Sequence, residues 1–236
     1  MGVPKYHLDA IFDPHRAHPD DAHSILMRLI PRGSRVLELG CASGYLSGYM
    51  ERALACRVTG LEADPDAARI AAGRCSTVYT VDLDTPGALE VARAGAPYDV
   101  LLAAAVLEHL KYPGRVLRDA HTVLVPGARV IVSLPNVAHW SIRLRLMLGR
   151  FDYTDYGVMD RTHLHFYTLK TGRELLTAHG YRVERLHIAG SGLQNVFNSL
   201  ARRLARPLPR PLLPGLLAYE LIYEARGGVP PDQNGS

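Results

Sequence analysis

The segment VLELGCASGY, residues 36–45, constrains the fold of this chain more than any other. An apolar run reaches Glu38 and gives way to glycines and small residues, and a helical pattern follows, so we expect a buried strand, a tight turn and a helix start. A second apolar stretch ends in Glu62, about twenty residues beyond the turn, where nucleoside-binding parallel sheets place a carboxylate on a ribose. The pair predicts a nucleoside-containing cofactor across the ends of two adjacent strands.

Beyond this segment, apolar runs alternate with amphipathic stretches. Strands that are apolar throughout and spaced by helices are typical of a parallel sheet covered on both faces. The predicted strands are Arg35–Leu39, Arg57–Leu61, Thr77–Val81, Asp99–Ala103, Ala128–Leu134, Arg182–Ile188 and Leu217–Ala225. The predicted helices are one that begins near Pro19, then Tyr45–Leu54, Asp66–Arg74, Pro86–Arg93, Gly114–Val123, His139–Gly149, Leu169–His179 and Gln194–Arg206.

The length of 236 residues fits one large domain, and a hydrophobic content of 47% excludes a disordered chain. We expect a single domain over residues 1–226, with an N-terminal helical cap over 1–31 and acceptor-site insertions over 138–216. Residues 227–236 are expected to form a flexible tail.

Charge and cysteine content favour a cytoplasmic protein. The net charge of +4 is mild, and no block of like charge marks a nucleic-acid-binding arm. The 3 cysteines are too few and too scattered for a disulfide framework. The start of the chain does not resemble a signal peptide, and no apolar run approaches the ~18 residues of a membrane span.

The turn and the two acids each have a binding interpretation and a plainer one. Gly40 and Gly44 permit positive φ and a close approach of backbone to a ligand, or they form a tight turn and nothing more. Glu62 would accept hydrogen bonds from ribose hydroxyls, or it caps the next helix, which Asp64 can also do. Asp82 suits contact with a base edge but is equally a common turn former.

At this point the residues resemble a known family. The order and spacing of VLELGCASGY, GLEADP, VYTVDLD, YDVLLAAAVLEHL and PGARVIVSLPN resemble the class I S-adenosylmethionine-dependent methyltransferases, over about residues 32–186 and more weakly through the last strand. The segment DRTHLHFYT is similar to a region after the fifth strand in a small-molecule branch. The resemblance implies a Rossmann-like α/β fold: a seven-stranded, mostly parallel sheet with helices on both faces and the last strand antiparallel.

The same resemblance implies S-adenosyl-L-methionine as the cofactor and a set of residues that bind it. The methionine part would lie on the turn, the ribose on Glu62, and the adenine beside Asp82. Where the family commonly has a third glycine this chain has Ala42, whose methyl group would be strained at positive φ. The implied set is Glu38, Gly40, Cys41, Ala42, Gly44, Tyr45, Glu62, Ala63, Asp82, Leu83, Ala104, Ala105 and Val106.

A dinucleotide-dependent dehydrogenase is the alternative on a related fold. GCASGY lacks the last glycine of the dinucleotide fingerprint, because Tyr45 occupies its place and would obstruct helix packing near a pyrophosphate. The VLEHL element has no role in that fingerprint. The sequence therefore favours the methyltransferase.

Methyl transfer needs alignment of the acceptor and, where the acceptor carries a proton, a base. Residues 152–168 hold the densest group of polar and aromatic side chains, and His163 is our first candidate for the base, ahead of His109. Arg161 would orient an anionic substrate or pair with Asp160. In the structural alternative, Asp160, Arg161 and His163 only brace the loop through hydrogen bonds.

A metal site stays open as a further alternative. His163 and His165 would point the same way in an extended segment, and Asp160 would complete a ligand set. Three ligands so close in sequence require an unusual bend, so we expect no metal.

A basic amphipathic helix is predicted over Gln194–Arg206. It would act as a lid, a homodimer face or a membrane-surface contact, or it would simply pack its apolar face on the sheet.

The sequence as a whole predicts a methyltransferase acting on a small molecule, at a hydroxyl of a sugar, glycan precursor or secondary metabolite. The alternatives are N- or C-methylation of a small molecule, or a non-catalytic cofactor-binding protein on the same fold. Nucleic acid is not expected as a partner, because no Asn-Pro-Pro-aromatic motif follows the fourth strand.

Overall fold

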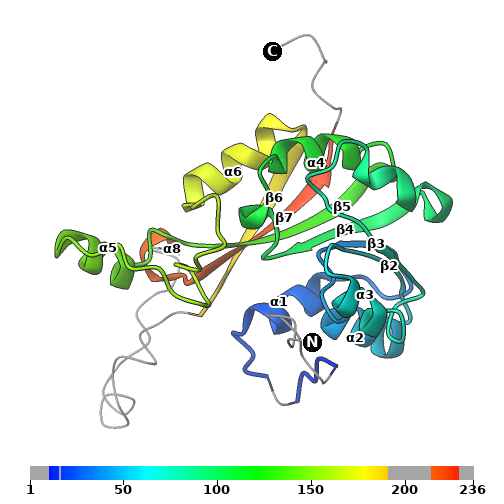
Figure 1. Cartoon of the computed structure of the whole chain (residues 1–236), viewed down its shortest axis with the longest axis horizontal. Helices are drawn as coiled ribbons and strands as arrows, with labels where there is room; N and C mark the ends of the chain where they lie inside the picture. The colour runs from blue at the N-terminus through cyan, green and yellow to red at the C-terminus, as the bar shows by residue number, and fades with distance from the viewer. Residues whose placement is uncertain (1–10, 16, 191–213, 229–236) are drawn as a thin grey trace.

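One seven-stranded sheet organises the chain in the computed structural model, which describes residues 11–15, 17–190 and 214–228 (Figure 1). Its central strands are largely apolar, because helices cover both of their faces. The strands are β1 (Arg35–Leu39), β2 (Arg57–Glu62), β3 (Thr77–Thr80), β4 (Tyr98–Ala104), β5 (Leu124–Pro135), β6 (Tyr181–Ala189) and β7 (Glu220–Gly227).

The strand order is β3-β2-β1-β4-β5-β7-β6. The first five strands pair in parallel, and β7 runs antiparallel to both β5 and β6. This confirms the fold expected from the sequence, including the antiparallel last strand. The chain leaves β1 toward β2 on one side and returns to β4 on the other, which opens a crevice at the carboxyl ends of β1 and β4.

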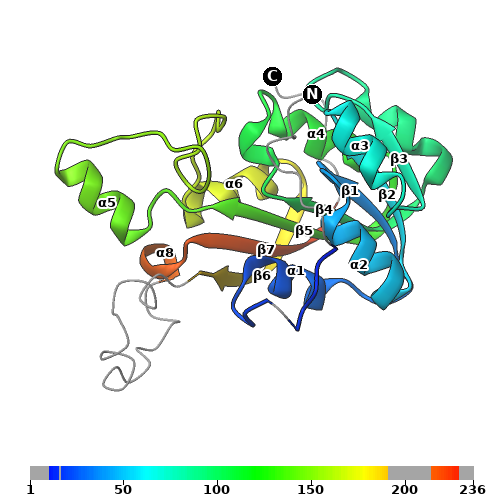
Figure 2. The ribbon, with the colours of Figure 1, turned by 60° about the horizontal axis from the view of Figure 1, so that its bottom comes forward.

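The helices form two layers. They are α1 (Ala22–Leu29), α2 (Tyr45–Leu54), α3 (Pro65–Ala71), α4 (Pro113–Ala120), α5 (Trp140–Met147), α6 (Leu169–Ala178) and α8 (Pro214–Leu217), with 3₁₀ helices η1 (Ala88–Gly95) and η2 (Leu107–His109). Figure 2 shows α1 and α2 below the sheet and α4 and α6 above it.

Successive side chains of each strand point to opposite faces of the sheet and pack against different helices. Val36 and Val100 pack with α1 and α2, whereas Leu37 and Leu101 pack with η1, α4 and α6. All four side chains are fully buried, and each contributes on the order of 1.5–3 kcal/mol through burial. The period-two pattern of the strands therefore fixes which helices lie on which face.

Several element bounds differ from the sequence expectation, two of them for a clear structural reason. The helix predicted over Pro86–Arg93 is the 3₁₀ helix η1, which begins after Gly87. The strand predicted from Leu217 begins only at Glu220, because Pro214 starts the short helix α8 ahead of it. The helix predicted over Gln194–Arg206 lies outside the described residues.

Helix α5 projects beyond the sheet and is followed by a long loop that returns to α6 (Figure 2). The return is held at its end by a bridge between Asn136 and Tyr167. No helix within the described ranges is long and apolar enough to cross a bilayer.

Candidate active site

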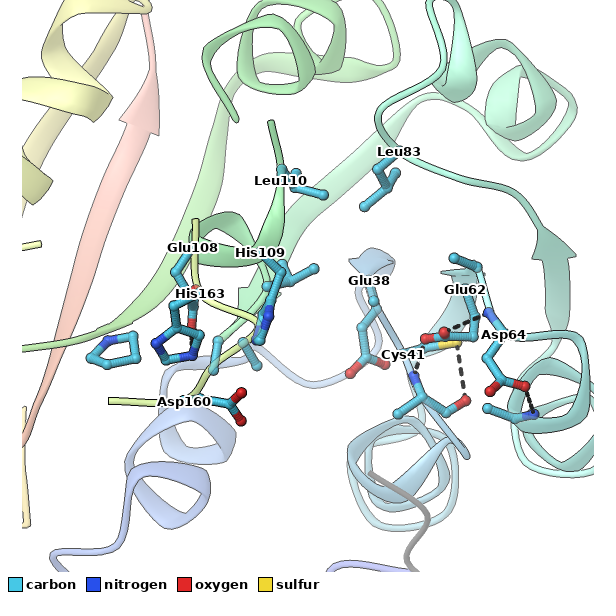
Figure 3. Close-up of a pocket in the computed structure, with 18 of the residues that line it drawn as sticks. Glu38, Cys41, Glu62, Asp64, Leu83, Glu108, His109, Leu110, Asp160 and His163 are labelled. Atoms are coloured by element: carbon cyan, nitrogen blue, oxygen red, sulfur yellow. Dashed lines mark hydrogen bonds and ion pairs between the residues drawn. The ribbon is translucent and has the colours of Figure 1, made fainter. Parts of the chain in front are cut away.

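A cavity of about 810 Å³ opens at the carboxyl ends of β1, β2 and β4 (Figure 3). This is the edge where parallel sheets bind ligands, and the volume lies in the ~300–1,000 Å³ range of small-molecule sites. Of the cofactor residues implied by the sequence, Gly44 alone does not line it. The others do: Glu38, Gly40, Cys41, Ala42, Tyr45, Glu62, Ala63, Asp82, Leu83, Ala104, Ala105 and Val106.

The turn after β1 alternates through three left-handed residues, with φ of 64° at Gly40, 47° at Ala42 and 75° at Gly44. A Cβ on Gly40 would lie 2.6 Å from Val106 Cγ2, so its absence lets the turn approach the wall after β4. A Cβ on Gly44 would lie 3.1 Å from the Ala71 Cα. Gly44 therefore serves the packing of α2 on α3, while Gly40 shapes the cavity.

Ala42 holds the conformation that the sequence marked as strained. Replacing it with glycine should raise the free energy of unfolding by about 0.5–1 kcal/mol, because left-handed φ costs an L-residue ~1–2 kcal/mol and the greater freedom of unfolded glycine offsets part of the gain. Urea denaturation measures the change. The matched control is Ala63→Gly, which also alters the cavity lining but has no positive φ and should lower stability. Equal shifts for the two variants would contradict strain at Ala42.

Glu38 is a buried acid on the cavity floor. It is 3% exposed, and its carboxylate accepts a hydrogen bond from the Ser47 hydroxyl of α2. Burial raises the pKa of Glu38 to about 7, and the nearby charge of Glu62 adds to the effect. A cationic ligand group beside Glu38 would favour its ionised form, which suits the ammonium of a methionine moiety.

The raised pKa of Glu38 makes stability depend on pH. Between about pH 4.5 and 7 the folded protein binds more protons at Glu38 than the unfolded chain does. The stability that protonated Glu38 contributes is therefore lost as pH rises to about 7. Glu38→Gln removes this titration. We expect the parent to lose roughly 3 kcal/mol relative to Glu38→Gln between pH 4.5 and 8, measured by denaturant unfolding without cofactor. Parallel stability profiles for the two proteins would contradict the raised pKa.

Glu62 at the end of β2 is tied to the turn. Its Oε2 accepts a hydrogen bond from the Ala42 amide at 2.8 Å, and its Oε1 accepts one from the Asp64 amide at 2.9 Å. Asp64 caps α3 by accepting from the amides of Asp66 and Ala67. Because Asp64 performs the capping, Glu62 is left to position the turn and face the cavity.

The loop after β3 forms the far wall. The Asp82 carboxylate accepts from the Asp84 amide at 2.8 Å, so the turn-forming interpretation of Asp82 is present alongside its place in the cavity. Asp84 accepts from the Lys111 amide at 2.9 Å and the Tyr112 amide at 3.1 Å. The loop after β3 is thereby joined to the segment that follows η2.

Three side chains converge on the side of the cavity opposite Glu62 in Figure 3: Glu108 and His109 of η2, and His163 of the long loop. The Leu164 amide donates to the Glu108 carbonyl at 2.8 Å, which brings the loop onto η2. The imidazole centroids of His109 and His163 are 4.7 Å apart, and His163 Nε2 lies 3.9 Å from Glu108 Oε1. Burial raises the pKa of Glu108 to about 8.

The other predicted catalytic residues are placed differently. Asp160 is 1% exposed, lines the cavity and accepts from the amide and hydroxyl of Thr162, each at 2.8 Å. Arg161 pairs with Asp155 at 2.8 Å on the surface and does not line the cavity. His165, expected to point the same way as His163, is also absent from the lining.

The sequence reasoning missed several lining residues. In the sequence, Glu108 is an acid between apolar residues in VLEHL. That pattern is also common on protein surfaces, so it does not identify a buried site residue. Glu220 of β7, His23 of α1 and Tyr219 also line the cavity and carry no local sequence motif. Their positions depend on how distant elements meet.

The cavity fits S-adenosylmethionine by charge. Among the described residues its lining contains no lysine or arginine, whereas its acids are Glu38, Glu62, Asp64, Asp82, Asp84, Glu108, Asp160 and Glu220. A sulfonium and an ammonium are stabilised by such a lining, and the two phosphates of a nicotinamide dinucleotide would be repelled. The close approach of the turn at Gly40 to Val106 leaves the backbone of the turn at the cavity wall.

Comparison with known proteins agrees with this geometry. A family model described as a methyltransferase domain matches residues 15–186. The ubiquinone biosynthesis O-methyltransferase of Xanthomonas axonopodis pv. citri (strain 306) is 30% identical over 125 residues, 52% of each chain. The chain thus spans about half the length of such curated relatives.

Solved structures share the fold. A methyltransferase from Archaeoglobus fulgidus, described as S-adenosylmethionine-dependent, has a TM-score of 0.60 at 16% identity, covering 86% of this chain and 92% of its own. Magnesium protoporphyrin IX methyltransferase from Synechocystis PCC 6803, with bound S-adenosylhomocysteine, has a TM-score of 0.55 at 17% identity over 86% and 78%. The resemblance found in the sequence is confirmed for family, fold and cofactor: this chain belongs to the methyltransferase domain family and has the fold of the S-adenosylmethionine-dependent methyltransferases.

Proposed function

We propose that the protein transfers the methyl group of S-adenosylmethionine to a hydroxyl oxygen of a small molecule. The observation that carries this proposal is the pair of imidazoles, His109 and His163, lining the same cavity as the cofactor residues. A hydroxyl must lose its proton as the C–O bond forms, and imidazole has the intrinsic pKa to accept it near neutral pH.

The proposed reaction assigns a role to His163. Bound S-adenosylmethionine would supply the methyl group: the acceptor oxygen would bond to the methyl carbon as the C–S bond breaks, and sulfur would keep the electron pair of that bond. His163 would accept the hydroxyl proton, and the products would be a methyl ether and S-adenosylhomocysteine. His163 Nδ1 lies 3.1 Å from the Val158 carbonyl oxygen, which can only accept, so Nδ1 carries a proton and Nε2 holds the lone pair.

The names of the relatives and the tyrosines at the cavity opening support a small hydroxyl-bearing acceptor. The relative from Xanthomonas is named for O-methylation in ubiquinone biosynthesis, which favours a small molecule with a hydroxyl. The cavity rim carries Tyr156 and Tyr219, 64% and 40% exposed, which suit stacking on a ring. Sugars, glycan precursors and aromatic secondary metabolites all fall within this class.

N-methylation of an amine is the second candidate, and the acidic lining of the cavity favours it. Paired acceptors that differ only in a hydroxyl or an amine on the same ring or sugar discriminate the two functions. We expect a 1:1 yield of methylated product and S-adenosylhomocysteine with the hydroxyl member, identified by mass and by the position of the new methyl group. Product from the amine alone would overturn O-methylation, and cofactor binding without any product across the panel would favour a non-catalytic protein.

A further inference from the structure

Glu108 is buried in a way that the methyl-transfer proposal does not explain. Its side chain is 1% exposed and lines the cavity, and neither carboxylate oxygen has a hydrogen-bond partner among the described residues. A buried carboxylate without partners is costly, and such groups are normally paired or coordinate a cation.

The two histidines beside Glu108 present lone pairs. Because His163 Nδ1 donates to the Val158 carbonyl, its Nε2 is an acceptor, and this atom lies 3.9 Å from Glu108 Oε1. His109 Nδ1 lies 3.3 Å from the Thr162 carbonyl oxygen and 3.0 Å from Thr162 Oγ1, whose own proton goes to Asp160. His109 Nδ1 is therefore also the protonated nitrogen, and Nε2 carries its lone pair. Imidazoles held through Nδ1–H by backbone carbonyls are typical of metal ligands.

The three side chains are close enough to share one ion (Figure 3). One nitrogen from each of His109 and His163 and one oxygen of Glu108 all lie within 4.8 Å of one another. Ligand atoms at ~2.1 Å from a tetrahedral ion lie roughly 3.4 Å apart, so rotamer adjustments of about 1 Å would close the set. When Glu108 is ionised, its carboxylate and the imidazole lone pairs beside it would repel one another, and a cation between them would remove that repulsion.

We propose that Glu108, His109 and His163 bind a divalent first-row transition cation. Two imidazole nitrogens and one carboxylate suit Zn²⁺, Fe²⁺, Co²⁺ or Mn²⁺, whereas Ca²⁺ and Mg²⁺ prefer oxygen ligands. Three protein ligands leave coordination positions open toward the cavity. This site differs from the one considered from the sequence: Asp160 supports His109 through Thr162, and His165 is not part of the set.

The consequence for the reaction rests on the proposed function, whereas the binding of the cation does not. An acceptor hydroxyl at an open position of the ion would have its pKa lowered by the positive charge. With the histidines engaged as ligands, the ion would take over the acidifying role assigned to His163, and water would carry the proton away. The ion held by Glu108, His109 and His163 would then favour acceptors that have an oxygen able to coordinate it.

The test is a titration of the untagged, chelator-treated full chain with Co²⁺ and, by calorimetry, with Zn²⁺. We expect one equivalent bound per chain, with visible d–d absorption from Co²⁺. Glu108→Gln and His109→Ala should each weaken binding by at least ~100-fold. The matched control is His165→Asn, a histidine of the same loop outside the set, which should bind as the parent does. Absence of saturable uptake, or equal uptake by Glu108→Gln, would overturn the site.

Turnover and S-adenosylmethionine affinity measured on the same samples separate the two proposals. Cofactor affinity within twofold of the parent shows that each variant is folded. O-methylation that persists in metal-free protein would overturn the role of the ion and leave the proposed function standing. One bound equivalent that depends on Glu108, without O-methylated product from any acceptor, would overturn the proposed function and leave the metal site standing.

Discussion

Replacing His163 with alanine is expected to lower kcat by roughly 100- to 10,000-fold, the range that a positioned acid or base supplies. The residue is 8% exposed, lines the cavity and is oriented by the Val158 carbonyl. Affinity for S-adenosylmethionine should change little, because Glu62 and the glycine turn lie on the other side of the cavity. Single-turnover methylation at saturating cofactor measures the effect over a range of pH.

The structural alternative gives a different pattern. If His163 only braces the loop, alanine would reduce stability while the folded fraction keeps full activity at every pH. His165→Ala is the matched control, since it removes an imidazole from the same loop outside the cavity lining. Comparable losses of kcat in both variants would show a general disturbance of the loop, contrary to a specific role for His163.

Replacing Glu62 with alanine should weaken S-adenosylmethionine binding by roughly 10- to 100-fold. The ribose would lose charge-assisted hydrogen bonds worth about 1.5–3 kcal/mol. The Ala42 amide would also lose its acceptor, so the strained turn that lines the cavity would be held less firmly. Isothermal titration calorimetry of parent and variant measures the change in Kd.

The control for Glu62 is Asp66→Ala, which removes a nearby carboxylate that pairs with Arg69 on α3 and does not line the cavity. Its affinity should match that of the parent. Parent-like binding by Glu62→Ala would exclude the ribose contact, and equal weakening in both variants would assign the effect to local charge.

The elements around the cofactor edge are the ones that local sequence predicts well. The strand Arg35–Leu39 and the helix Tyr45–Leu54 have the bounds expected from the sequence, because an apolar run, a glycine turn and an amphipathic pattern follow one another there. Glu62 follows from its spacing to the turn. Each of these features depends on residues close in sequence, so local sequence patterns are enough to predict it.

The acceptor side depends on contacts between distant segments. Glu108 and His163 meet because the long loop donates two amide hydrogen bonds, from Leu164 and His165, to the Glu108 carbonyl. No pattern in either segment encodes that pairing. For Arg161 the sequence suggested a substrate contact or a pair with Asp160, and the structure shows a pair with Asp155 at the surface. The boundary between α8 and β7 was missed because a short apolar run fits a helix and a strand equally well.

The most direct test of the central claim is calorimetric titration of the pure protein with S-adenosylmethionine and S-adenosylhomocysteine, with NAD and NADP as controls. We expect saturable binding of the first two and none of the dinucleotides, because the described cavity lining supplies carboxylates for a sulfonium and an ammonium and no lysine or arginine for phosphates. Binding of NAD or NADP in place of S-adenosylmethionine would contradict the account.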